Sequence, residues 1–385
     1  MKRLLFVFGL SVAAIGFAAI QTGCSYCPCT GGGSLLQRPK MLAALPPSCP
    51  TPDGMAIDAD GNNLVVACPN FMNQARPACL IKIDKKSGAV IPWANVPPLA
   101  DTGVACPMGI DFGPDGDLYV CDNQGWKGTP QGQFKGRVLR LRIRGNQAVA
   151  TVVAEGLEHP NGVRVHNGFL YVTQSLMSKV KHPSGLMVSA VYRFRLDDTH
   201  VNVGNALSDP NILATFVTEN RFCQYGVDGL AFDSKGNLFV GNFGDGRLYK
   251  ITFDAKGKML GSTLFAQTDF DARLDPKRPG FLECAARARM RTTDGLCVDA
   301  HDNLYVADFS NNAIARVTPG GVVTVLWQNG DTDGRDGGLN EPGEPIVWNG
   351  KLVVANFDAV FGPDHPDKVN TKNDQPATLS VLALP

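Results

Sequence analysis

The sequence lacks a net charge, and its charged residues form no block of one sign. Its 36 Lys and Arg residues balance 36 Asp and Glu residues, and no basic run is present. We therefore expect no binding of nucleic acid or of an anionic membrane surface through a basic field. Long helical periodicity and heptads are also scarce, whereas 42 Gly and 26 Pro residues interrupt the 385 residues. This composition predicts an all-β fold rich in turns.

Long hydrophobic runs are absent except at the N-terminus. Lys2 and Arg3 precede the apolar run 4–20, and small residues follow it before Cys24. This pattern is typical of a signal peptide, which we predict over residues 1–23. No other run is long enough to span a bilayer. We expect an exported protein, located in the periplasm or at the cell surface.

Cys24 follows Thr22 and Gly23 directly, as in lipoproteins. Gln21 departs from this pattern, because Leu is usual at that position. Lipidation of Cys24 is therefore one of two possibilities, and such an anchor would be the protein's only contact with a membrane. We interpret the Cys- and Gly-rich residues 24–37 as a linker.

The eleven cysteines favour disulfides over metal thiolates, because the protein is expected to be exported. The segment CSYCPC lacks the histidine that haem attachment requires. Cys68 and Cys79 enclose one loop and are a candidate pair, but the overall connectivity stays open.

One phrase returns six times along the chain. Each copy has a short apolar run, a tight turn containing Gly, Asn or Asp, and a second apolar run, which is typical of a β-hairpin. The copies are PDGMAIDADGNNLVVAC (52–68), PMGIDFGPDGDLYVC (107–121), PNGVRVHNGFLYVTQ (160–174), VDGLAFDSKGNLFVGN (227–242), TDGLCVDAHDNLYVAD (293–308) and GEPIVWNGKLVVAN (343–356).

Two further strand-like runs follow most hairpins, for example 137–143 and 148–154. Six repeats of four strands predict a six-bladed β-propeller over residues 38–385, with one domain and a monomeric state. After the sixth phrase only 377–384 remains, which leaves that blade one strand short. We expect 39–45 to supply the missing outer strand and to close the ring, because closure removes the open sheet edge.

The first strand of each blade lines the central channel of a propeller, so the residues that open the phrases form a ring. Five of the six carry side-chain oxygens, and converging acids repel one another unless a cation lies between them. Hard oxygen ligands favour calcium, although another divalent cation is possible. The alternative is that Asp or Asn before Gly only makes a turn. The ring positions are Asp53, Met108, Asn161, Asp228, Asp294 and Glu344.

Long loops are expected on the same face as the starts of the first strands, as a substrate site or lid requires. One of them contains FLECAARARM (281–290), which predicts a short helix across the channel mouth. The others are 122–136, 175–187, 266–292 and 357–376.

The phrases HPNGVRVHNGFLYVTQS and VDGLAFDSKGNLFVGNF resemble the senescence marker protein/gluconolactonase (regucalcin) family, to which paraoxonases are distantly similar. In that family an Asn of a PNG phrase and an Asp of the next DG phrase bind calcium. The resemblance implies that Asn161 and Asp228 are calcium ligands. The family's third ligand is a Glu in a GE…PVW phrase of the first blade, and its match here is Glu344 in the last repeat. The chain therefore resembles a family member permuted by one blade.

The resemblance ends at one position. The family commonly orients a sugar lactone with an Asn and an Arg two residues before it, where this chain has Met108 and Cys106. A more apolar lactone or ester is therefore the expected small-molecule substrate.

The resemblance implies calcium-dependent hydrolysis of a lactone or ester. Asp228 is the first candidate to take a proton from the attacking water. His159 is the second candidate base, and its alternative is a solvent-facing loop histidine. Asp53 and Asp294 are expected to line the pore, together with Met108.

Other functions stay open at this point. The segment DTDGRDGG (331–338) is similar to a calcium loop, but Arg335 occupies a ligand position and a polar loop is the alternative. No G-x-S-x-G nucleophile elbow is present. DNLYVADFSNNAIARVTPGG (302–321) resembles NHL repeats, which favours a cell-surface binding propeller with structural calcium as the alternative function. A quinone-dependent dehydrogenase ranks last, because the chain lacks a basic and aromatic constellation for that cofactor.

Overall fold

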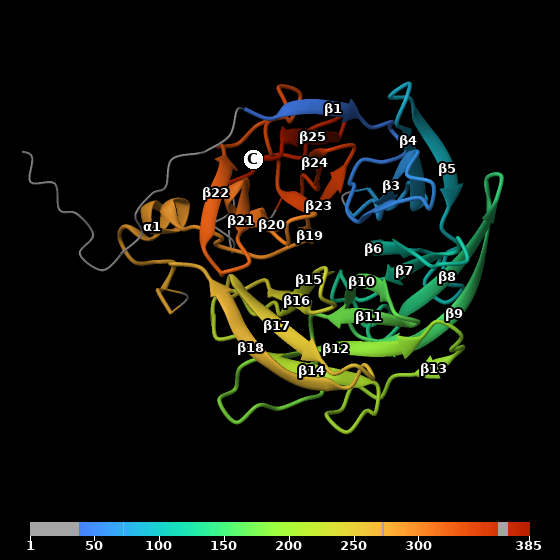
Figure 1. The fold of residues 1–385 in the computed structure, drawn as a ribbon, viewed down its shortest axis with the longest axis horizontal. Helices are drawn as coiled ribbons and strands as arrows, with labels where there is room; N and C mark the ends of the chain where they lie inside the picture. Colours follow the sequence, from blue (N-terminus) through green and yellow to red (C-terminus); the bar gives the residue numbers. More distant parts are fainter. Residues whose placement is uncertain (1–37, 72, 272, 361–368) are drawn as a thin grey trace, which may run out of the picture.

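The computed structural model describes residues 38–385 except 72, 272 and 361–368. Six antiparallel sheets stand around a central axis as the blades of a propeller (Figure 1). Their innermost strands contact one another in chain order, and the last of them contacts the first. The predicted six-bladed, all-β fold is confirmed. The described part of the chain contains no helix long and apolar enough to cross a membrane. The signal peptide, the linker and Cys24 lie outside the described residues.

The first three blades follow the order of the chain, each running from the axis outward. Blade 1 contains β2 (Met55–Ile57), β3 (Asn63–Cys68), β4 (Cys79–Asp84) and β5 (Val90–Asn95). Blade 2 contains β6 (Pro107–Phe112), β7 (Leu118–Asp122), β8 (Gly136–Arg144), β9 (Gln147–Leu157) and the short parallel strand β13 (Val201–Asn202). Blade 3 contains β10 (Pro160–His166), β11 (Phe169–Gln174), β12 (Val188–Arg195) and β14 (Ile212–Val217).

The other three blades complete the ring. Blade 4 contains β15 (Val227–Phe232), β16 (Leu238–Asn242), β17 (Arg247–Phe253) and β18 (Met259–Gln267). Blade 5 contains β19 (Leu296–Val298), β20 (Leu304–Asp308), β21 (Ala313–Val317) and β22 (Val323–Gln328). Blade 6 contains β23 (Pro342–Trp348), β24 (Lys351–Asn356), β25 (Thr378–Ala383) and β1 (Lys40–Ala44).

The N-terminal strand closes the propeller as predicted. β1 pairs antiparallel with β25, so that Lys40 lies opposite Val381 and Ala44 opposite Thr378. The outer edge of blade 6 is thereby covered by the opposite end of the chain. The apolar core lies between neighbouring blades, and the cluster around Ala43, Met55 and Leu379 ties blade 6 to blade 1.

The same hydrogen bond recurs in four blades between residues 16 positions apart. It joins the segment before the first strand to the last residue of the second strand. Four second strands end in a buried polar residue whose side-chain oxygen accepts from a backbone N–H just before the first strand. Because a buried acceptor without a partner is costly, this explains why apolar strands end in Asp, Gln or Asn. The bonds are Cys106 N to Asp122 (2.7 Å), Glu158 N to Gln174 (2.8 Å), Thr292 N to Asp308 (2.9 Å) and Asn340 N to Asn356 (3.1 Å).

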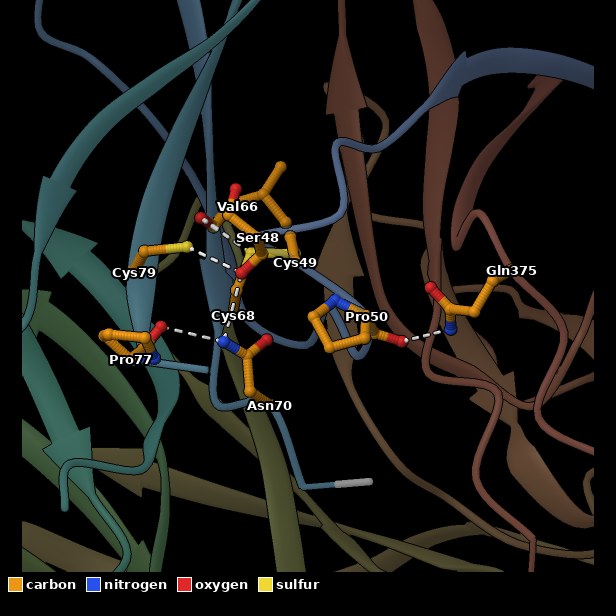
Figure 2. Close-up of a disulfide and its surroundings, with 9 residues drawn as sticks. All are labelled: Ser48, Cys49, Pro50, Val66, Cys68, Asn70, Pro77, Cys79 and Gln375. Carbon is orange, nitrogen blue, oxygen red and sulfur yellow. Dashed lines mark hydrogen bonds between the residues drawn. A yellow bond between two sulfur atoms is a disulfide. The ribbon is translucent and has the colours of Figure 1, made fainter. Parts of the chain in front are cut away.

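Blade 1 replaces this hydrogen bond with a disulfide. The residue 16 positions before Cys68 is Pro52, which has no N–H to donate. Cys68 is instead bonded to Cys49. Cys79 lies opposite Cys68 on β4, but its thiol is free and donates to the Ser48 carbonyl at 3.3 Å (Figure 2). The candidate pair Cys68–Cys79 is therefore wrong, because Cys68 is already engaged by Cys49.

The short helix exists, but its predicted position is wrong. α1 (Phe281–Arg287) lies at the rim of the ring beside β22, away from the channel (Figure 1). Gln328 of β22 donates to the Ala286 carbonyl at 2.9 Å, and Asn311 donates to the Ala285 carbonyl at 2.9 Å. The helix packs there because Phe281, Cys284 and Ala285 bury their side chains with Phe270.

Candidate functional site

The six predicted ring positions lie where the innermost strands meet. The glycine after a ring residue packs against the ring residue of the next blade, too closely for any side chain. A Cβ on Gly229, for example, would lie 2.3 Å from the Asp294 carbonyl oxygen, and one on Gly162 would lie 2.7 Å from that of Asp228. The glycines therefore serve close packing around the axis, and the turn explanation for these phrases is wrong.

Four acids of this ring lie close enough to affect one another. Burial raises the pKa of Asp53 well above its usual range, and the carboxylates of Asp294 and Glu344 raise it further. Burial also raises the pKa of Asp228, with Asp53 and Glu344 adding to the shift. Oδ2 of Asp53 is buried without a hydrogen-bond partner. The ring is therefore a group of buried acids whose ionised forms a cation would stabilise.

Glu344 has a partner that the sequence did not suggest. Nη2 of Arg164, on β10 of blade 3, donates to Oε1 of Glu344 on β23 of blade 6. The same guanidinium donates to the carbonyls of Val163 (2.8 Å) and Leu296 (3.2 Å). Burial raises the pKa of Glu344, and the Arg164 charge opposes this rise. Arg164 is thus an internal cation at the ring.

Asn161 belongs to a second polar group beside the acids. Its Nδ2 donates to the Tyr225 hydroxyl at 3.1 Å, and Nδ1 of His159 lies 3.0 Å from that hydroxyl and 3.1 Å from Nδ2 of Asn123. Only 7% of His159 is exposed, and burial lowers its pKa to about 4. His159 is therefore not a solvent-facing loop histidine. It is neutral near pH 7, and its Nδ1 faces the side chains of Asn123 and Tyr225.

Aromatic side chains surround the channel above the ring, and we call them the aromatic collar. Three of them directly follow the second strands of blades 4, 5 and 6, and Phe71 lies three residues after the second strand of blade 1. The buried Met108 and Cys106 belong to the same apolar cluster. The collar closes between blades 2 and 3 through the hydrogen bond from Asn123 to His159. Its ring contacts are Trp126–Phe71 (4.0 Å), Phe71–Phe357 (5.2 Å), Phe357–Phe309 (5.7 Å), Phe309–Phe243 (5.8 Å), Phe243–Tyr225 (5.4 Å) and Tyr225–His159 (5.4 Å).

The donors at the ring fit a hard cation in their chemistry. Asp53, Asp228 and Asp294 offer carboxylate oxygens, Asn161 offers an amide oxygen, and the unpartnered Oδ2 of Asp53 is a buried acceptor. Within residues 38–71, 73–271, 273–360 and 369–385, no three His, Cys, Asp or Glu side chains are already gathered on one point. The predicted ligand Glu344 is held by Arg164. Binding of a cation would therefore require side chains of the ring to move together.

Solved structures of other proteins superpose on this chain over most of its length and support the six-bladed fold. A gluconolactonase from Xanthomonas campestris superposes with a TM-score of 0.54 at 14% identity, over 92% of this chain and 98% of that one. A calcium-binding regucalcin from Agrobacterium tumefaciens superposes with a TM-score of 0.53 at 13% identity, over 91% and 94% of the two chains. The chain has the fold of these propellers.

The same fold also carries other chemistry. The PQQ-bound aldose sugar dehydrogenase of Streptomyces coelicolor superposes with a TM-score of 0.53 at 15% identity, over 90% of this chain and 97% of that one. No protein-family model matches the sequence, and no curated protein sequence matches it. At these sequence identities the structural similarity establishes the six-bladed architecture alone. The reaction depends on the side chains at the site.

Arg164, Tyr225, Asn123 and the aromatic collar were missed by the sequence analysis. A signal for the collar existed, because Phe243, Phe309 and Phe357 each follow the last residue of a second strand. Arg164 was also visible as a charged residue inside the apolar run VRV. Asn123 also directly follows the last residue of a second strand, but its side chain is polar where the others are Phe. Tyr225 carries no such signal, because it lies in a loop whose path depends on the assembled ring.

Proposed function

We propose that the chain is a calcium-dependent hydrolase of lactones or esters, as the resemblance of its phrases implies. The observation that carries this proposal is that the buried acids Asp228, Glu344 and Asp53 lie within electrostatic reach of one another, in the ring to which Asn161 also belongs. Asn161 and Asp228 would hold the cation, with Glu344 as the predicted third ligand and Asp53 or Asp294 beside them. A bound calcium ion would polarise the substrate carbonyl and stabilise the oxyanion that develops on it.

Asp228 is the residue we assign to proton transfer. Its side chain is buried at the ring beside Asp53 and Glu344, so that it would lie next to a water molecule held by the cation and take the proton from it. The base role of His159 is less well supported by its surroundings. Its Nδ1 already faces Asn123 and Tyr225, and its low pKa disfavours the protonated form.

The aromatic collar supports an apolar substrate. A sugar lactone carries several hydroxyl groups that need hydrogen-bond partners when they are desolvated. Phe71, Phe243, Phe309 and Phe357 provide none, and Met108 replaces the family's polar residue. We therefore propose a lactone or ester with an aryl or alkyl group, which the ring edges of the collar would contact.

A second candidate is a binding propeller without catalytic activity. The ion pair between Arg164 and Glu344 favours it, because the pair fills the ring with the protein's own cation. Hydrolysis of aryl esters and alkyl lactones, with and without a chelator, separates the two. The hydrolase predicts activity that the chelator and Asp228→Asn both abolish. The binding propeller predicts no activity under either condition.

A further inference from the structure

The two ends of the Asn161 amide differ chemically, and only one can bind a cation. Oδ1 is an acceptor, whereas Nδ2 carries two protons and repels a cation. Nδ2 donates to the Tyr225 hydroxyl at 3.1 Å. No hydrogen bond to Oδ1 is found in the part of the chain that the structure describes. The direction of this amide therefore decides whether Asn161 offers an oxygen to the ring.

The direction of the amide is fixed by a chain of hydrogen bonds that has one polarity. Nδ2 of Asn123 can only donate, and it lies 3.1 Å from Nδ1 of His159. Nδ1 is therefore an acceptor, and the ring proton of His159 is on Nε2. The Tyr225 hydroxyl, 3.0 Å from the same Nδ1, donates to it. Its oxygen is then left to accept from Asn161, which directs Nδ2 rather than Oδ1 toward Tyr225.

Packing keeps these groups in place. Asn123 is fully buried, and His159 and Asn161 are 7% and 6% exposed. The His159 and Tyr225 rings meet edge to face at 5.4 Å, and Tyr225 meets Phe243 in the same way at 5.4 Å. The Tyr225 ring therefore cannot swing away without disrupting the collar, and its hydroxyl stays beside Asn161.

We propose that Tyr225, oriented by His159 and Asn123, is the positioning residue that turns Oδ1 of Asn161 toward the cation. The inference rests on the proposed function, since it concerns the same calcium site. Tyr225 acts through Asn161 and does not itself bind the cation. Outer partners that orient ligands in this way typically change metal affinity by 10- to 100-fold.

An Asp at position 161 makes the proposal testable. Asp carries an oxygen at both ends of its side chain, so either direction offers a ligand. Tyr225→Phe removes the hydroxyl and should weaken calcium binding about tenfold when residue 161 is Asn. In Asn161→Asp the same Tyr225 substitution should change calcium affinity by less than about twofold. A merely structural role for Tyr225 would weaken binding equally in both backgrounds.

Calcium affinity is measured by isothermal titration calorimetry on the wild type, the two single variants and the double variant, with thermal unfolding in chelator as the check on folding. Tyr119→Phe is the matched control, because it removes a hydroxyl that donates to the Leu196 carbonyl at 3.2 Å away from the ring. This control should leave calcium affinity unchanged. If Tyr225→Phe does not fold, His159→Leu frees the Tyr225 hydroxyl and should weaken binding in the Asn161 background only.

The outcomes distinguish the two proposals. Calcium binding by the wild type with no effect of Tyr225→Phe, or with equal effects in both backgrounds, overturns the positioning role and leaves the proposed function standing. A wild-type chain without calcium affinity overturns the calcium site, and the positioning role with it.

Discussion

Arg164 and Glu344 form an ion pair between blades on opposite sides of the ring. Arg164 comes from the first strand of blade 3 and Glu344 from the first strand of blade 6. The side chains are mostly buried, with 17% and 9% exposed. The pair places a positive charge of the protein at the site where the sequence predicts a calcium ligand.

Removing Arg164 should strengthen calcium binding, because the guanidinium competes with calcium for Glu344. We expect Arg164→Met to raise calcium affinity about tenfold, which corresponds to about 1.4 kcal/mol. The same variant should be less stable than the wild type in chelator, because Glu344 then lacks its partner. Calorimetric titration gives the affinity, and urea unfolding gives the stability. Unchanged affinity in Arg164→Met would mean that Glu344 is not a ligand.

The aromatic collar should select the substrate. Phe309→Leu removes ring contacts to Phe243 and Phe357, so we expect KM for an aryl ester to rise about three- to tenfold, with little change in kcat. The matched control is Phe232→Leu, because Phe232 stacks on His166 outside the collar. Steady-state kinetics on aryl and alkyl substrates provide the measurement. A wild-type preference for polyhydroxylated sugar lactones would contradict the selective role of the collar.

Asp308 should make stability depend on pH. Burial raises its pKa to about 6, from a usual value of 3.8. Between about pH 4 and 6 the folded state binds the proton more tightly than the unfolded chain, so the free energy of unfolding falls as pH rises. The loss is at most about 3 kcal/mol. Asp308→Asn should remove this pH-dependent component, and it should lower stability at every pH because its Nδ2 cannot accept the Arg291 N–H as Oδ2 does. Urea unfolding at pH 4, 5, 6 and 7 tests it, and an unchanged slope in the variant would refute it.

The Cys49–Cys68 disulfide should stabilise blade 1. Its cysteines are 19 residues apart, and a loop of this length predicts a loss of about 3 kcal/mol when both become Ser. Cys79→Ser is the control, since a hydroxyl can also donate to the Ser48 carbonyl. We expect that variant to lie within about 1 kcal/mol of the wild type. Peptide mapping should find Cys79 unpaired, and a Cys68–Cys79 peptide would contradict the structure.

The repeats made the fold predictable from sequence. Six copies of one hairpin phrase set the number of blades, and the missing strand after residue 356 predicted closure by β1. The ring positions followed from the repeat as well, because equivalent residues of a propeller lie at equal distances from the axis. The sequence did not show that these glycines allow neighbouring blades to pack closely, because the close approach of Gly229 to Asp294 exists only between assembled blades.

The rest of the site could not be predicted because its contacts join distant parts of the chain. Arg164 and Glu344 are 180 residues apart, and no repeat relates them. Tyr225 lies 64 residues from Asn161 in an irregular loop. The predicted position of α1 was wrong for a similar reason, because its apolar side chains pack against Phe270 at the rim and not over the channel.

The calcium affinity of the folded chain, measured beside Glu344→Gln, tests the central claim most directly. The channel ring predicts one bound calcium ion per chain in the wild type, removed by chelator and bound at least about tenfold more weakly by the variant. Absence of calcium binding in the wild type, or equal affinity in Glu344→Gln, would contradict the assigned site. The first of these results would also favour the binding propeller over the hydrolase.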